Sequence, residues 1–243
     1  MSKKTKTKDV MINPYELQSM KKFIKEERNP SKHLHQMSAI FRMIVCGASG
    51  AGKTVFVTNL LNRYRNHFNK IYIFTSETEP IYDWLLSQIP GDLIAIYYNN
   101  FTPLLQTDKL NDFFYGSSLC IIDDMVTKSK KELQPIMELF IRGRKIHNGV
   151  SLCFLSQSWF DIPKLIRQQI NYCILIKVNN NRDLRAILQE FKLDCSVEQL
   201  QNMYNYCCLN SFGDVLMIDK QSNQKSGKTY RKNFLEFLNP QNF

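Results

Sequence analysis

Residues 41–54, FRMIVCGASGAGKT, decide the fold of this chain. The first six form a compact apolar run that predicts a buried strand, and the remaining eight match the pattern G-x-x-x-x-G-K-[ST] in full. The residues that follow, as far as position 67, have the apolar spacing of a helix, with one side formed by Val57, Leu60, Leu61 and Tyr64. A strand, a glycine-rich loop and a helix in this order predict the nucleotide-binding unit of a P-loop NTPase.

Each part of the loop has a chemical role. The glycines let the backbone curl, so that its N–H groups reach phosphate oxygens. Lys53 would place its charge against the β- and γ-phosphates, the Thr54 hydroxyl would bind Mg²⁺, and the dipole of the following helix would add to the attraction. The cofactors predicted are therefore ATP and Mg²⁺. The predicted nucleotide-binding residues are Gly47, Ala48, Ser49, Gly50, Ala51, Gly52, Lys53, Thr54 and Val55.

A second metal ligand is predicted in SLCIIDDM at 118–125. Its four apolar residues predict a buried strand that ends at Asp123, which would hold Mg²⁺ together with Thr54. Many strands end in Asp at a turn, but here a phosphate loop lies 70 residues upstream. Asp124 follows directly and could polarise the attacking water, which favours hydrolysis over transfer to a kinase substrate.

The apolar strand predicted at 151–155 is followed by Ser156-Gln157-Ser158. If this strand lies between the phosphate-loop strand and the Asp123 strand, Gln157 reaches the γ-phosphate region. There it could orient water or sense hydrolysis. The alternative is an ordinary surface glutamine after a strand.

Three arginines are candidates for a finger that stabilises charge on the γ-phosphoryl group from a neighbouring subunit: Arg142, Arg144 and Arg167. Arg142 and Arg144 follow the helix predicted after Asp124, and each could equally be a charge at a helix C-terminus. Among the three, Arg144 is the predicted catalytic arginine.

The rest of the chain predicts one α/β fold around the phosphate loop. Further strands are predicted at 70–75, 93–98, 173–178 and 214–219, and helices at 79–89, 103–115, 129–142, 181–191 and 196–206. Several strands are continuous apolar runs, which is typical of a mainly parallel sheet flanked by helices on both faces. No run of 18 apolar residues occurs, so no membrane-spanning segment is expected.

Charge divides the chain into a basic N-terminal arm (1–32) with a short helix expected at 14–28, an ATPase core (33–219) and a basic C-terminal tail (220–243). The arm holds nine Lys/Arg and four Asp/Glu, and the tail holds five Lys/Arg and one Glu. The core therefore contributes only +1 of the net charge of +10. Basic ends suggest contact with a polyanion, with nucleic acid as the leading candidate, whereas the alternative is that the lysines keep the chain soluble.

The chain has seven cysteines, an odd number, and no CxxC pair. Cys46, Cys120, Cys153 and Cys173 lie in apolar runs, so we expect buried free thiols in a reducing compartment. The alternative is a zinc site, but the ligand spacing of such a site is absent.

Together these segments resemble the genome-packaging ATPases of large DNA viruses and virophages, a poxvirus-type group within the FtsK–HerA class of P-loop motors. The resemblance runs from about Phe41 to Arg185. It rests on FRMIVCGASGAGKT, SLCIIDDM, RGRKIHN, SLCFLSQSWFDIP and LIRQQINYCILIK in this order and spacing. The family commonly has adjacent Arg and His, whereas Lys145 and Ile146 here separate Arg144 from His147.

The resemblance implies a P-loop NTPase fold of the additional-strand, RecA-like kind. It also implies a homo-oligomeric ring of five or six subunits that drives double-stranded DNA into a capsid. It implies a capsid or portal-vertex protein as partner, and a viral protein acting in the cytoplasmic virus factory of the host or in the virion. By matching positions, it makes Lys53 and Thr54 nucleotide ligands, Asp123 the Mg²⁺ ligand, Asp124 the base and Gln157 the sensor.

Two other functions fit the phosphate loop. One is an ATP-dependent loader or transposition helper that binds DNA without pumping it. The other is a nucleoside or nucleotide kinase, for which the sequence offers Arg182 and Arg185 near a helix start but no clear lid. The Asp123-Asp124 pair favours water as the acceptor and so counts against the kinase.

Overall fold

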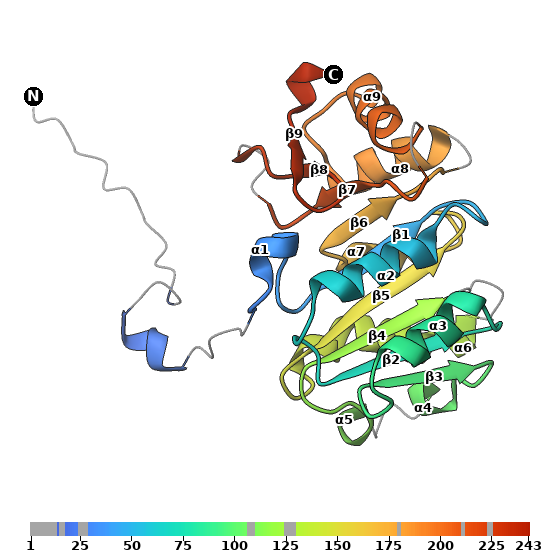
Figure 1. Ribbon diagram of the computed structural model, residues 1–243. Coiled ribbons are helices and arrows are strands. Elements are labelled where there is room, and N and C mark those ends of the chain that lie inside the picture. Colours follow the sequence, from blue (N-terminus) through green and yellow to red (C-terminus); the bar gives the residue numbers. More distant parts are fainter. Residues whose placement is uncertain are drawn as a thin grey trace, which may run out of the picture.

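The computed structural model describes residues 14, 18–23, 29–105, 110–123, 130–178, 181–209, 212–222 and 226–243. Within these ranges the strands form one nine-stranded sheet in the order β3-β2-β4-β5-β1-β6-β7-β8-β9 (Figure 1). The strands from β3 to β6 pair in parallel. The strands β7, β8 and β9 continue the sheet in antiparallel pairing. The mainly parallel sheet predicted from the sequence is thus confirmed.

Most of the observed elements in the first four-fifths of the chain agree with those predicted, but the short helices at 32–35 and 164–169 were not predicted. The strands are β1 (Arg42–Cys46), β2 (Lys70–Thr75), β3 (Ile94–Tyr98), β4 (Ser118–Asp123), β5 (Val150–Ser156), β6 (Tyr172–Leu175), β7 (Leu216–Asp219), β8 (Tyr230–Lys232) and β9 (Glu236–Leu238). The α-helices are α1 (Lys32–His35), α2 (Lys53–Arg63), α3 (Pro80–Gln88), α4 (Thr102–Leu105), α5 (Leu110–Phe113), α6 (Lys130–Arg142), α7 (Lys164–Gln169), α8 (Asn181–Phe191) and α9 (Val197–Cys208). Short 3₁₀ helices are η2 (Gln18–Phe23), η4 (Gly143–Lys145) and η6 (Pro240–Asn242).

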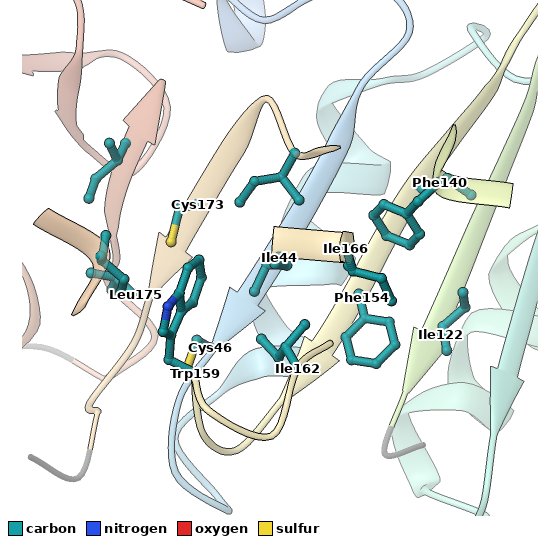
Figure 2. Packing of buried hydrophobic residues seen from close by; sticks show 14 of the residues in the cluster. Ile44, Cys46, Ile122, Phe140, Phe154, Trp159, Ile162, Ile166, Cys173 and Leu175 are labelled. Atoms are coloured by element: carbon teal, nitrogen blue, oxygen red, sulfur yellow. The ribbon is translucent and has the colours of Figure 1, made fainter. Parts of the chain in front are cut away.

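Both faces of the sheet are covered, which explains the continuous apolar runs. Met43 and Val45 of β1 pack on one face in a cluster with α2 and α3. Ile44 and Cys46 point to the other face, into a cluster with α6 to α9. Figure 2 shows this second cluster, with Trp159 and other side chains from the segment after β5 lying over the strands. All four β1 residues are fully buried, so only apolar side chains and neutral thiols are compatible with either face.

The strand order brings the predicted site residues to one edge. β5 pairs with β1 on one side and with β4 on the other, as the sequence interpretation of Gln157 required. Because these strands are parallel, the segments after Cys46, Asp123 and Ser156 leave the sheet at the same edge. Ligand sites in open parallel sheets form at this edge, outside the carboxyl ends of the strands.

Three expectations need correction. The single helix expected at 103–115 is two short helices, α4 and α5, on either side of residues that lie outside the described part. The strand at 214–219 is not the last, because β8 and β9 follow it in the same sheet. The predicted boundary between 219 and 220 therefore does not separate a tail from the core. Of the helix expected at 14–28, the structure describes residue 14 and η2.

The cysteines are free, and six of the seven are buried. Burial raises the pKa of the Cys46 thiol to about 12, which keeps it protonated and inert.

Among the described residues there is no group of three or more His, Cys, Asp or Glu side chains that could hold a metal ion. None of the helices in the described ranges is long and apolar enough to cross a membrane.

Candidate functional site

The glycine-rich loop connects β1 to α2 and is fixed by the neighbouring strands. The Gly47 N–H donates to the Ser156 carbonyl at 3.1 Å, and the Ala48 N–H donates to the Lys177 carbonyl at 3.2 Å. A Cβ atom at Gly47 would lie 2.0 Å from the Ile176 carbonyl oxygen, so no other residue fits there. The start of the loop is therefore held between the ends of β5 and β6.

The remaining loop glycines supply the curl expected from the sequence. Gly50 has a φ of 69° and Gly52 a φ of 102°, both in the left-handed region that glycine tolerates best. The Lys53 ammonium group donates to the Gly47 carbonyl at 2.9 Å and to the Ala48 carbonyl at 3.1 Å, so its side chain folds back over the loop. The only cation of the loop is thus held against the loop backbone, where it would meet a phosphate bound by the loop.

A cavity of about 330 Å³ opens in front of the loop. It is lined by Ser49, Gly50, Gly52, Lys53, Thr54, Val55, Glu77, Glu79, Ile81, Asp123, Leu155, Ser156, Gln157 and Phe212. Four of the predicted functional side chains, which are far apart in sequence, therefore meet: Lys53, Thr54, Asp123 and Gln157. The other predicted loop residues, Gly47, Ala48 and Ala51, form the base of the loop and do not line the cavity.

Asp123 ends β4 and is 6% exposed. The Tyr82 hydroxyl of α3 donates a hydrogen bond to its Oδ2 atom. Burial and the nearby Asp123 carboxylate both raise the pKa of Tyr82 well above its usual value, so the phenol stays a donor. Tyr82 thereby fixes one oxygen of Asp123. No sequence motif indicated this tyrosine, because its role depends on how α3 packs.

Glu77 and Glu79 also line the cavity and were missed by the sequence analysis. The Thr54 hydroxyl donates to the Glu79 Oε2 atom at 3.2 Å. Both glutamates follow β2, whose last residue, Thr75, stands beside Asp123 in the sheet. An apolar strand followed by acidic residues was the signal used for Asp123, and it is present here too, in KIYIFTSETE at 70–79. A hydroxyl and carboxylate oxygens are hard donors of the kind Mg²⁺ prefers, so these residues fit that metal.

One predicted catalytic residue, Arg144, does not line the cavity, and another, Asp124, lies outside the described residues. Arg144 lies in η4, before β5 begins, and shares a cavity of about 210 Å³ with Arg42 at the amino end of β1. The phosphate loop follows the carboxyl end of that strand. Arg144 therefore lies at the opposite edge of the sheet from the loop of the same chain.

The other candidate arginines differ in how they are held. Arg167 forms an ion pair with Glu190, and its guanidinium lies 5.6 Å from the centre of the Trp159 ring. Arg142 is the exposed last residue of α6. Arg167 therefore has an intramolecular role in packing α7 against α8, which counts against it as a finger.

Comparison with known proteins identifies a family and supports the fold. A sequence profile of the family described as "Poxvirus A32 protein" matches residues 20–228. The chain is 25% identical over 174 residues to "DNA packaging protein OPG160" of Monkeypox virus, covering 68% of this chain and 57% of that protein. The corresponding protein of Vaccinia virus (strain Copenhagen) has the same identity, with 63% of its length covered. The chain thus spans about three-fifths of the curated relatives that it matches.

Solved structures with the same fold include a viral genome packaging NTPase and a conjugation coupling protein. The genome packaging NTPase B204 of Sulfolobus turreted icosahedral virus 2, bound to sulfate, is 18% identical with a TM-score of 0.59, covering 81% of this chain and 97% of that one. Its complex with ATP-gammaS has a TM-score of 0.58 at 19% identity, covering 81% of this chain and 98% of that one. The pCW3 conjugation coupling protein TcpA, with ATPgS, is 10% identical with a TM-score of 0.57, covering 84% of this chain and 62% of that one. These similarities establish a P-loop ATPase fold.

Proposed function

The chain belongs to the Poxvirus A32 protein family, and from that premise we propose that it is an ATP-driven motor that translocates double-stranded DNA into a viral capsid. The observation that carries the proposal is the meeting of Lys53, Thr54, Asp123 and Gln157 around one cavity beside a complete phosphate loop. Relatives named for DNA packaging, and a fold shared with a genome packaging NTPase, support DNA as the substrate of the motor.

The residues of the cavity suit ATP hydrolysis. The backbone of residues 47–54 and the Lys53 ammonium group bind the phosphates, and the Thr54 hydroxyl and the Asp123 carboxylate hold Mg²⁺. When bound, the metal neutralises charge on the β- and γ-phosphate oxygens. Tyr82 orients Asp123, Gln157 faces the γ-phosphate and orients the attacking water, and Asp124 accepts a proton from that water.

The motor works as a homo-oligomeric ring in which Arg144 acts on the nucleotide of a neighbouring subunit. Arg144 lies at the edge of the sheet opposite to the phosphate loop of its own chain, so it reaches a nucleotide only on a neighbouring subunit. The capsid or its portal vertex is the proposed docking partner, and the cytoplasmic virus factory is the proposed site of action. Relatives from poxviruses support a viral origin.

The test is phosphate release from ATP with and without double-stranded DNA, followed by movement along DNA under load. We expect DNA to stimulate turnover and the protein to move directionally. Stimulation without movement would support a loader, and transfer of phosphate to an added nucleoside instead of water would support a kinase. Either result would overturn the proposed motor function.

The proposed finger is tested by mixing inactive subunits. Arg144→Ala subunits mixed with Lys53→Ala subunits should regain part of the activity, because some interfaces then combine an intact loop with an intact arginine. Arg185→Ala is the matched control, since Arg185 is also exposed but lies on a different helix, α8. Full activity of Arg144→Ala rings would remove Arg144 from the mechanism.

A further inference from the structure

Phe212 is an exposed aromatic residue at the mouth of the phosphate-loop cavity. It lies between α9 and β7, and 66% of its surface is exposed. The side chain lines the same cavity as Lys53 and Thr54. An exposed phenylalanine on a cavity wall presents an apolar face that a planar ligand could cover.

The position of this ring relative to the loop is set by close backbone contacts. A Cβ atom at Gly52 would lie 3.4 Å from the Gly213 Cα atom and 3.6 Å from the Phe212 Cζ atom. A Cβ atom at Gly213 would lie 3.5 Å from the Val55 Cγ1 atom. The Phe212-Gly213 segment therefore packs against the start of α2, where the loop ends.

The segment is anchored on its other side as well. The Asn233 side chain donates to the Asp214 carboxylate at 2.9 Å, and the Lys232 ammonium group lies 3.3 Å from the same carboxylate. Asn233 also accepts a hydrogen bond from the Val215 N–H at 3.1 Å. Strand β8 thus ties the residues after Phe212 to the sheet, and the ring is held beside the loop by the antiparallel edge.

We propose that Phe212 is the stacking platform for the base of the bound nucleotide. The inference rests on the proposed function, because it assumes that the loop holds a nucleoside triphosphate. With the phosphates cradled by residues 47–54, the nucleoside must leave the loop past its last residues, Thr54 and Val55. The ring of Phe212 stands on that side, next to Gly52 and Val55.

Lys177 adds a charge to this platform. Its ammonium group lies 5.6 Å from the centre of the Phe212 ring, and its carbonyl accepts the Ala48 N–H. A cation here is attracted both by the ring face and by the phosphate nearest the nucleoside. The ligand class is therefore a nucleotide, not an inorganic polyphosphate. Since every base has a π-face, Phe212 selects nucleotides over tripolyphosphate but not one base over another.

The test compares ATP with inorganic tripolyphosphate as ligands of the full chain. We expect Phe212→Ala to weaken ATP binding about ten-fold to a hundred-fold, the range typical of lost base stacking. Tripolyphosphate affinity should change less than about two-fold, since the loop and Lys53 are intact. Phe212→Trp should keep ATP affinity, and its added indole fluorescence should be quenched by ATP and not by tripolyphosphate.

The matched control is Phe160→Ala. Phe160 is also an exposed phenylalanine, 42% exposed, with the Arg182 guanidinium 4.3 Å from its ring centre, but it does not line the cavity. Its loss should leave the affinities for both ligands unchanged.

Unchanged ATP affinity in Phe212→Ala, or an equal loss for both ligands, would overturn the platform. If Phe212→Ala altered assembly but left the ratio of ATP affinity to tripolyphosphate affinity unchanged, Phe212 would instead be an interface residue. If the unmodified chain bound neither ligand, the proposed ATPase function would fail.

Discussion

The parallel part of the sheet, from β3 to β6, and the antiparallel edge, from β7 to β9, use charge in opposite ways. In the parallel part the strand interiors are apolar, and the acidic and basic groups gather where the strands end, around the cavity. In the antiparallel edge an ion pair is buried within the strands themselves: Asp219 of β7 and Arg231 of β8 are 6% and 2% exposed. Charge at the first region is available for a ligand, whereas charge at the second holds the fold together.

Arg231 connects three segments of the chain. Its Nη2 atom donates to the Asp219 Oδ2 atom at 2.5 Å. Its Nη1 atom donates to the His35 carbonyl at 3.2 Å and to the Gln36 carbonyl at 3.1 Å, so α1 is tied to the C-terminal strands. Burial raises the pKa of the Asp219 carboxyl, and Arg231 opposes that rise by stabilising the charged form.

This network changes the interpretation of the basic C-terminal residues. Arg231 is buried, and Lys232 pairs with Asp214. Lys225 lies outside the described residues, and Lys228 is exposed. The expectation that 220–243 is a basic tail for DNA is therefore wrong for Arg231, whose guanidinium faces protein carbonyls and a carboxylate. A test that neutralises all these residues together would destabilise the fold as well as remove charge.

The largest contrast between the two regions should appear with Lys53→Ala. Removing the charge that faces the phosphates should lower ATP turnover by about a thousand-fold or more, the scale on which such groups stabilise a phosphoryl transition state. Thermal stability should change little, because the ammonium group donates to carbonyls of the loop itself. Turnover and melting temperature, measured on the same preparation, check both parts. A strongly lowered melting temperature would mean that the loop, too, uses its charge to hold the fold.

The converse substitution is Arg231→Gln, which should cost about 3–5 kcal/mol of unfolding free energy. The loss leaves the Asp219 carboxylate buried without its cation and also removes the bonds to the α1 carbonyls. Denaturant unfolding measures the change, with Lys228→Gln as a surface control expected within about 0.5 kcal/mol. Adding Asp219→Asn to Arg231→Gln should recover part of the stability. An Arg231→Gln protein as stable as the control would show that the pair contributes nothing.

A smaller effect is expected from pH at His35, which lies beside this network. Its ring is fully buried, stacks on Tyr64, and accepts the Met37 N–H on Nδ1 at 3.0 Å, so it is held neutral. Burial, with His67 and Arg231 adding repulsion, lowers the pKa of His35 to about 4. The unfolded chain therefore binds a proton that the folded chain refuses, and the stability due to His35 is lost as pH falls from about 6.5 towards 4.

Between pH 7 and pH 5 this amounts to about 2 kcal/mol. The measurement is the free energy of unfolding at both pH values for the unmodified chain and for His35→Gln, which should lose less stability on acidification. His33→Gln, an exposed neighbour in α1, is the control and should behave like the unmodified chain. Equal acid sensitivity of all three proteins would contradict the role given to His35.

The parallel region was predictable because its signals are local. β2 and β4 occur at the residues predicted, and β5 has the predicted place between β1 and β4, because apolar runs and a phosphate loop fix both the strands and their function. The antiparallel edge was missed because β8 and β9 are three residues each, too short for periodicity, and one carries two basic residues. Tyr82 and Phe212 were missed for a related reason: Tyr82 contacts Asp123, and Phe212 lines the cavity, through packing of distant segments that no local pattern records. Glu79 does follow a local pattern, the apolar strand at 70–75, and was overlooked.

The smallest predicted effect concerns Lys228, the exposed lysine of the antiparallel edge. If it contacts a DNA phosphate, Lys228→Gln should reduce the slope of log affinity against log salt by about 0.9, the value for one phosphate contact. Lys3, Lys4, Lys6 and Lys8 can be replaced by Gln in a second variant, which should lower the slope further if the N-terminal arm also binds DNA.

DNA binding measured by anisotropy across a salt series gives the slopes. Basal ATP turnover should stay the same in both variants, since Lys228 does not line the phosphate-loop cavity and the other four lysines precede the residues that match the family profile. If neither variant changed the slope, the DNA contact would lie on the side of the parallel strands instead. The exposed basic residues Arg142, Arg144 and Lys145 would then be the next to neutralise, because copies of them from several subunits could converge in a ring.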